Sequence, residues 1–124
     1  MLEISKAVIQ KDGKYLLLKR ASNALSFPGL RDFTGWKDDP GETHTQSVMR
    51  EVKEETSYDI IPWDEMKRAE YHDKKYDLSF HYFIPASVRG EIRLSDEHSD
   101  LLRATLEEIK NLELHPSVPL FFDL

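Results

Sequence analysis

The chain contains no cysteine among its 124 residues, so the sequence predicts neither a disulfide framework nor thiolate chemistry. It has no apolar run long enough to cross a bilayer, and its first residues do not have the pattern of a secretory signal. We therefore expect a cytoplasmic protein that makes no membrane contact. An excess of positive charge is also missing, because the net charge is -6, and this disfavours binding to duplex nucleic acid through its phosphates.

Length and composition predict a single domain over residues 1–124. Hydrophobic residues make up 40% of the chain and charged residues 32%, which is typical of a globular domain with one core region. Strand-like and helix-like patterns alternate loosely along the chain. The expected fold class is therefore α/β (α+β), with a mixed central β-sheet.

Apolar and alternating runs predict strands over residues 3–10, 15–20, 31–34, 66–73, 76–88 and 101–105. The first two strands flank Asp12-Gly13, a dipeptide that favours a two-residue hairpin. A short helix is expected to begin at Thr105, and a last helical turn is expected near the C-terminus.

One longer helix is predicted after residue 43. Thr43 and Gln46 have the spacing of a capping box, and the helix is expected to end between Thr56 and Tyr58. Pro62 should prevent any further helix. At 100° per residue, one face should pack on the sheet, and it carries Thr45, Val48, Met49, Val52 and Thr56.

The adjacent arc of this helix carries Glu51, Glu54 and Glu55, at the expected border between core and solvent. Like charges at these spacings cost about 0.2–0.5 kcal/mol per pair on an open helix, and more where water is excluded. A hard divalent cation such as Mg²⁺ would offset this repulsion. Arg50 is close enough along the helix to orient Glu54. The alternative is a solvated helix face without a ligand.

The spacing of these residues carries more information than their charge. Glu42 is followed by seven residues, and then by Arg50-Glu51, Val52, one residue and Glu54-Glu55. This arrangement resembles the signature of the Nudix hydrolases. The flanking segments GWKDDPGE, PGLRDFTG and DEHSDLLRATLEEI also resemble parts of that family. The resemblance implies a Nudix-like α/β/α sandwich that hydrolyses a diphosphate linkage and uses Mg²⁺, which Mn²⁺ can replace.

The resemblance also implies roles for individual residues. The implied metal ligands are Glu51, Glu54, Glu55 and the carbonyl of Gly35. The implied catalytic residues are Arg50, Glu51, Glu54 and, from a late loop, Glu97 as a candidate base.

Three residues depart from the family pattern, one of which is Tyr58, in place of an aliphatic residue. Trp36 stands where the signature begins with a glycine, and Ser57 stands where a glycine follows the paired glutamates. Glycine favours the left-handed conformation in which many helices end. We therefore expect a different helix ending at Ser57.

Three residues are candidates for binding the substrate. Trp36 and Phe27 can stack on a base, and Arg20 can meet a phosphate. Two of them also have a structural interpretation, which is core packing for Phe27 and a solvated strand end for Arg20. None of the five histidines has metal-ligand spacing with another histidine.

The leading hypothesis is a MutT-like pyrophosphohydrolase that acts on a nucleoside triphosphate. The alternatives are an ADP-ribose or sugar-nucleotide hydrolase, a Nudix-like module that binds a nucleotide without cleaving it, and a structural protein whose acidic helix is an interaction face. The expected partner is a small nucleotide, and both a monomer and a homodimer are open.

Overall fold

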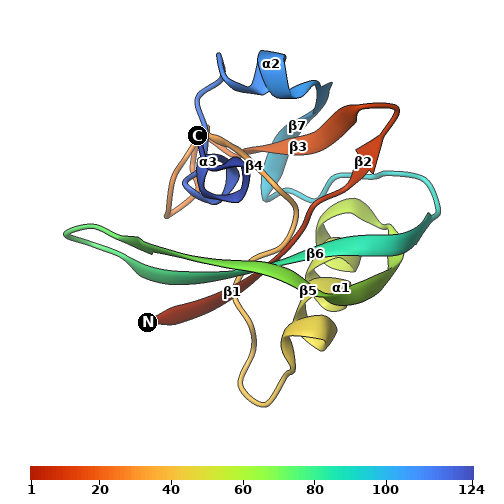
Figure 1. The fold of residues 1–124 in the computed structure, drawn as a ribbon, viewed down its shortest axis with the longest axis horizontal. Coiled ribbons are helices and arrows are strands. Elements are labelled where there is room, and N and C mark those ends of the chain that lie inside the picture. Colours follow the sequence, from red (N-terminus) through yellow and green to blue (C-terminus); the bar gives the residue numbers. More distant parts are fainter.

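A computed structural model describes residues 1–124, which form two β-sheets and three helices (Figure 1). The first sheet has the order β1-β6-β5, with strands β1 (Leu2–Ala7), β6 (Asp77–Arg89) and β5 (Asp59–His72). Strand β1 runs parallel to β6, and β6 runs antiparallel to β5. This sheet is therefore mixed, as the sequence predicted.

The second sheet is centred on β3 (Lys14–Arg20). This strand pairs antiparallel with β2 (Gln10–Lys11), β4 (Arg31–Asp32) and β7 (His98–Ala104). The hairpin between β2 and β3 turns at Asp12 and Gly13, whose φ angles of 53° and 77° are both positive. The predicted hairpin is thus confirmed, since such φ angles are those of a two-residue turn.

The helices are α1 (His44–Thr56), α2 (Leu106–Ile109) and α3 (Ser117–Phe122). They cover two separate hydrophobic cores. One core joins the mixed sheet to α3 and contains Ile4, Phe80, Tyr82 and Val118. The other joins the mixed sheet to α1 and contains Ala7, Val48, Val52 and Phe83. Because neighbouring residues of a strand point to opposite faces, α1 and α3 lie on opposite sides of this sheet.

The first turn of α1 forms as the sequence predicted. The hydroxyl of Thr43 accepts a hydrogen bond from the amide of Gln46 (3.0 Å), and the side chain of Gln46 accepts one from the amide of Thr43 (2.9 Å). The predicted packing face was partly wrong, because Thr45 is exposed and Met49 is 43% exposed. The helix is rolled so that part of its glutamate-bearing face is buried instead.

Strand β5 is longer than the sequence predicted. It begins at Asp59 rather than at residue 66, and it includes Pro62. The register with β6 shifts on both sides of Pro62, and β5 is the outer strand of its sheet. A bulged edge strand tolerates the missing N–H of proline, which explains why Pro62 does not interrupt β5. The predicted strand over residues 3–10 is divided between β1 and β2.

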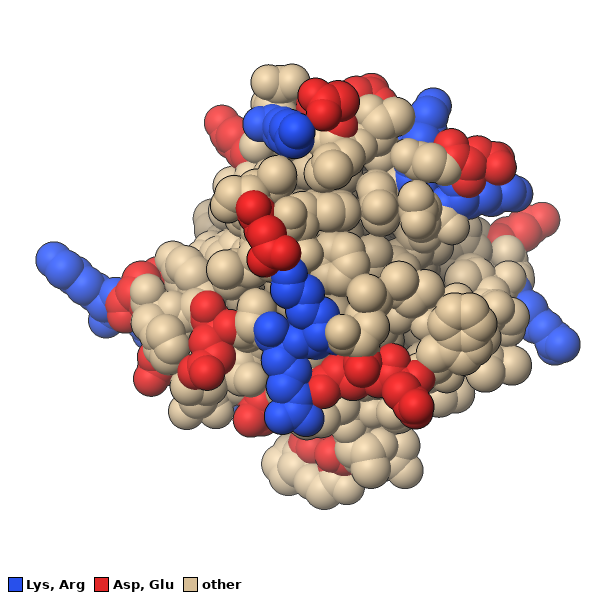
Figure 2. Space-filling model, in the orientation of Figure 1, with Lys and Arg blue, Asp and Glu red and all other residues tan.

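Acidic and basic side chains are intermixed on the face that Figure 2 shows. The ion pairs of the chain include Arg68 with Glu65 (2.5 Å) and Lys67 with Asp123 (2.9 Å).

None of the helices is both long and apolar enough to span a membrane.

Helix α1 ends in a left-handed residue although no glycine is present. Ser57 has φ 67° and ψ 4°, and its amide donates to the carbonyl of Lys53 (3.0 Å). The expectation of a different helix ending was therefore wrong. The hydrogen bonding of the C-cap holds Ser57 in a conformation that is costly for a residue with a Cβ.

Ser57→Gly is expected to raise the free energy of unfolding by about 1 kcal/mol, because glycine adopts the left-handed conformation without steric cost. Urea denaturation of the metal-free protein measures this change. Ser57→Ala is the matched control, since it removes the hydroxyl but keeps the Cβ, and it should give no such gain. A lower unfolding free energy for Ser57→Gly than for the wild type would contradict the interpretation.

Candidate active site

Helix α1 presents two of its glutamates to the interior and one to solvent. Glu51 is 8% exposed and Glu55 is 1% exposed, beside Val48 and Val52. The side chain of Glu54 is 56% exposed. The prediction that all three share a border position is therefore wrong, because Glu55 lies within the protein.

Buried hydrogen-bond donors explain the position of Glu55. Its Oε1 atom accepts hydrogen bonds from the hydroxyl of Thr34 (3.0 Å) and from the amide of Gly35 (2.9 Å). Burial raises the pKa of Glu55 to about 8, although the charge of Lys6 and the Gly35 amide act in the opposite direction. Burial also raises the pKa of Glu51. For both carboxyl groups the cost of burial outweighs the effect of the nearby positive charge, which is Lys6 for Glu55 and Arg50 for Glu51. A divalent cation would favour their ionised forms further.

Gly35 lies in a segment that crosses closely over β1. Its φ angle is 113°, and a Cβ atom on this residue would lie 2.1 Å from the carbonyl oxygen of Ser5. On either side of Gly35, the amide of Ser5 donates a hydrogen bond to the backbone carbonyl of Trp36 (3.1 Å), and the amide of Ala7 donates one to the backbone carbonyl of Thr34 (2.9 Å). The carbonyl of Gly35, an implied metal ligand, accepts a hydrogen bond from the buried ammonium of Lys6 (2.5 Å).

Arg50 connects four of the acidic residues of this region. Its guanidinium donates two hydrogen bonds to Glu42, at 2.6 and 2.8 Å. Its third nitrogen, Nη1, lies 3.0 Å from Glu51 and 3.2 Å from Glu54, and Nη2, one of the two donors to Glu42, lies 3.4 Å from Asp39. The hydrogen bonds from Arg50 lower the pKa of Glu42 to about 2. The expected contact with Glu54 is present, but Glu42 is the closest partner.

The loop before β7 brings Glu97 to the same place. The amide of Ser95 donates to the carbonyl of Glu55 (3.0 Å), and the amide of Arg93 donates to that of Thr56 (2.8 Å). These bonds attach the loop to the last turn of α1. Carboxylate oxygens of Glu51, Glu55 and Glu97 consequently lie within 4.8 Å of one another, close enough to share one metal ion.

A pocket of about 430 Å³ opens beside these carboxylates. Two of the three candidate substrate-binding residues, Arg20 and Trp36, line it, and the Arg20 guanidinium lies 4.7 Å from the centre of the Trp36 ring. The lining comes from three segments: Arg20, Ala21, Asn23, Ala24, Leu25 and Ser26; Trp36 and Glu55; and Asp96, Glu97 and His98.

Phe27, the third candidate, does not line this pocket. Its ring packs 4.9 Å from that of Tyr76 and 4.6 Å from that of His115, between ring centres. The structural interpretation of Phe27 therefore fits its surroundings. Arg20 is held in place by Ser26, because its Nε donates to the Ser26 carbonyl (2.9 Å) and Nη2 donates to the Ser26 hydroxyl (3.0 Å).

Sequence reasoning missed two notable lining residues, His98 and Leu25. His98 is 7% exposed, its Nδ1 atom has no hydrogen-bond partner, and burial lowers its pKa to about 4. Its position next to Glu97 was a usable signal. Leu25 is 98% exposed at the pocket, and nothing in its loop sequence distinguishes it.

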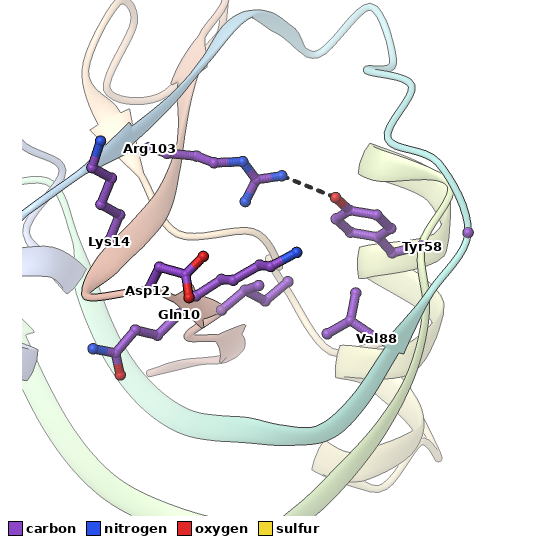
Figure 3. Close-up of a pocket in the computed structure, with 9 residues that line it drawn as sticks. Gln10, Asp12, Lys14, Tyr58, Val88 and Arg103 are labelled. Atoms are coloured by element: carbon purple, nitrogen blue, oxygen red, sulfur yellow. Dashed lines mark hydrogen bonds between the residues drawn. The ribbon is translucent and has the colours of Figure 1, made fainter.

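A larger pocket of about 610 Å³ lies between the β2–β3 hairpin and the end of β6, and contains none of the carboxylates above (Figure 3). Figure 3 shows Arg103 reaching across it to the hydroxyl of Tyr58, to which it donates a hydrogen bond of 3.1 Å. The residues that line it are Ile9, Gln10, Lys11, Asp12, Lys14, Tyr58, Val88, Gly90 and Arg103.

Gly35→Ala tests the close crossing of this residue over β1. The substitution should destabilise the protein more than Gly41→Ala, which also has a positive φ (83°) but no atom within 4 Å of its Cβ position. We expect Gly41→Ala to lower the free energy of unfolding by about 1–2 kcal/mol, because of its backbone conformation. Gly35→Ala should lower it by about 1–3 kcal/mol more, because the segment that carries Gly35 must also shift away from β1. Equal unfolding midpoints for the two variants in urea would show that the crossing is not tight.

Glu55 makes stability depend on pH in the absence of metal. Because its pKa in the folded protein is raised from 4.5 to about 8, the folded state holds more protons than the unfolded state in this window. The free energy of unfolding should therefore fall as pH rises from 5 to 8, by at most about 1.4 kcal/mol per pH unit from this group.

Urea titrations in EDTA across this pH range measure the slope. Glu55→Gln should reduce it, because the amide resembles the protonated carboxyl group. Glu107→Gln, at an exposed position of α2, should keep the slope of the wild type. A slope that is the same in all three proteins would argue against a buried, mostly protonated Glu55.

Comparison with known proteins places this geometry in a family. The family model for the NUDIX domain matches residues 3–123. The nucleoside triphosphatase NudI of Enterobacter sp. (strain 638) is 29% identical over an alignment of 126 residues. The alignment covers 93% of this chain and 89% of that protein. NudI of Salmonella agona (strain SL483) is 32% identical over 119 residues, covering 87% and 84%.

A solved structure agrees with the sequence comparisons. The crystal structure of a MutT protein from Methanosarcina mazei Go1 superposes with a TM-score of 0.89 at 28% identity, covering 98% of this chain and 90% of that one. The family model spans almost the whole chain, including the helix that carries the carboxylates. The chain therefore belongs to the Nudix hydrolase family.

Proposed function

We propose that this protein is a Mg²⁺-dependent pyrophosphohydrolase that cleaves the diphosphate linkage of a nucleoside triphosphate. One observation carries the proposal, which is that Glu51, Glu55 and Glu97 meet beside a pocket walled by Arg20 and Trp36. The names of the relatives, nucleoside triphosphatase and MutT, support the substrate class.

The residues of the pocket fit a hard divalent cation. The donors are carboxylate oxygens, and two of them are buried groups whose pKa values are raised by burial. Mg²⁺ favours such oxygen ligands and, when bound, neutralises charge on phosphate oxygens. Glu51, Glu54 and Glu55 would hold it, with Glu97 beside them, and Mn²⁺ should replace it.

The other residues would position the substrate and the carboxylates. Arg50 fixes Glu51 and Glu54 relative to Glu42, so the acidic groups enter the reaction already oriented. Glu97, on the loop side of the pocket, would accept a proton from the attacking water. Trp36 would present its ring to the base, and Arg20 would present its guanidinium to a phosphate.

A second candidate is a Nudix domain that binds a nucleotide without hydrolysing it. The observation that favours it is the bond between Lys6 and the Gly35 carbonyl, because an oxygen that could bind a metal already accepts a hydrogen bond from an ammonium. Calorimetry that shows nucleotide binding, with no product after long incubation with Mg²⁺ or Mn²⁺, would support this candidate.

A panel of nucleotides tests the proposal directly. Nucleoside triphosphates, ADP-ribose and sugar nucleotides should be incubated with Mg²⁺, with phosphate and pyrophosphate release measured separately. Pyrophosphate from a triphosphate is the expected result. Turnover of only ADP-ribose or a sugar nucleotide would keep the enzyme class but overturn the substrate.

Glu54→Gln should lower kcat by about 10²–10⁴-fold, because an exposed carboxylate next to the buried pair is lost as a ligand or base. The fold should be retained, since the Glu54 side chain is 56% exposed and its one hydrogen-bond and ion-pair partner is Arg50. Glu107→Gln on α2 is the matched control, with wild-type turnover expected. Undiminished turnover by Glu54→Gln, with an unchanged circular dichroism spectrum, would exclude Glu54 from the reaction.

A further inference from the structure

Two histidines and a glutamate meet at the opposite end of α1 from Glu55. His44 is the first residue of α1, His81 lies in β6 and Glu3 lies in β1. One potential ligand atom of each lies within 4.8 Å of the others. The two imidazole rings stack with their centres 3.6 Å apart, and His81 is 2% exposed. Sequence spacing gave no sign of this cluster, because its residues come from three separate elements.

His44 has a carboxylate on one ring nitrogen, and His81 has a carboxylate on each. Nδ1 of His81 contacts Glu65, and Nδ1 of His44 lies 2.5 Å from Asp38. The other nitrogen of His81, Nε2, lies 2.7 Å from Glu3. A carboxylate on the nitrogen that does not bind the metal is the usual partner of a metal-binding histidine, because it fixes the ring and its tautomer.

The local charge also favours a divalent cation. Three carboxylates, Glu3, Asp38 and Glu65, surround the two imidazoles, and the only arginine paired with them is Arg68, 2.5 Å from Glu65. The three carboxylates therefore outnumber the one arginine by two, and a divalent cation would balance them.

We propose that Glu3, His44 and His81 form a binding site for a transition-metal ion of the Zn²⁺ type, separate from the carboxylates of the candidate active site. Two imidazole nitrogens and one carboxylate oxygen are a ligand set that suits Zn²⁺ better than Mg²⁺, which favours oxygen ligands only. A fourth position is left for water.

The ion requires one local rearrangement. A metal lies in the plane of each imidazole that binds it, so the two rings, which are only 17° from parallel, must splay apart. His81 is held in place by its buried position and by Glu65. The side chain of His44 is 35% exposed and is therefore the one that turns.

The position of the site gives the ion a structural role. Asp38 accepts a hydrogen bond from the hydroxyl of Ser5 (2.7 Å), and its amide donates to the carbonyl of Glu3 (3.0 Å). The ion would thus join β1, β6, the segment before α1 and the first turn of α1. This segment also carries Gly35, so the ion would stabilise the approach to the carboxylates without contacting them.

The proposal is tested by titrating Zn²⁺ into the untagged, metal-stripped protein in excess Mg²⁺ and measuring the heat of binding by calorimetry. We expect one Zn²⁺ per chain and a rise in Tm on its addition. His44→Ala and Glu3→Gln, which both leave the buried His81 in place, should weaken binding at least about 10-fold, and Asp38→Asn should weaken it about 10–100-fold.

Two controls locate the ion. His72→Ala removes a histidine that also contacts two carboxylates, Glu70 and Asp77, but has no second imidazole beside it, so it should bind Zn²⁺ as the wild type does. Glu55→Gln should also bind it normally. The proposal is overturned if the wild type binds no Zn²⁺, if His44→Ala and Glu3→Gln bind it undiminished, or if either control loses it equally. Because these readouts do not involve turnover, they are independent of the proposed hydrolase activity.

Discussion

The buried ammonium of Lys6 is the contact on which the site depends. It donates to Asp32 of the second sheet (2.8 Å) and to the carbonyl of Gly35 (2.5 Å), and neither Lys6 nor Asp32 is exposed. The other oxygen of Asp32 accepts a hydrogen bond from Ser117 of α3 (2.8 Å). A charge without solvent must keep its partners, because a lone buried ion is very costly. Lys6 therefore fixes both sheets, α3 and the glycine segment in one arrangement.

The peptide units of Gly35 link this ion pair to the carboxylates of α1. The carbonyl of Gly35 is held by Lys6, and its amide donates to Glu55. Glu55 can be buried because these donors exist, and its burial brings Glu51 and the Glu97 loop into one pocket. The chemistry of the site is thus a result of packing: the three carboxylates are close together, Glu51 and Glu55 are poorly solvated, and Arg50 orients Glu51 before any ligand arrives.

Features that depend on neighbouring residues were predictable from the sequence. The capping box of Thr43, the hairpin at Asp12 and the spacing of the glutamates all rest on local geometry, and the structure contains them. Features that depend on distant partners were not predictable. The roll of α1 requires donors from another segment, Pro62 is tolerated only because β5 is a bulged edge, and the left-handed conformation of Ser57 is imposed by the hydrogen bonds of the helix end. The meeting of His44 with His81 likewise exists only in three dimensions.

The pocket combines a rigid side with an adjustable one. Its acidic lining is Glu55 of α1, which is fixed by the core on one face of the mixed sheet, together with Asp96 and Glu97 of the loop attached to that helix. Much of the remaining lining is the connection from Ala21 to Ser26, with Leu25 almost fully in solvent. Insertions or replacements in that connection would alter which nucleotide fits while leaving the acidic groups undisturbed. Selectivity and reactivity are therefore separable in this scaffold, and a redesign of substrate range could begin at Leu25 without touching the helix.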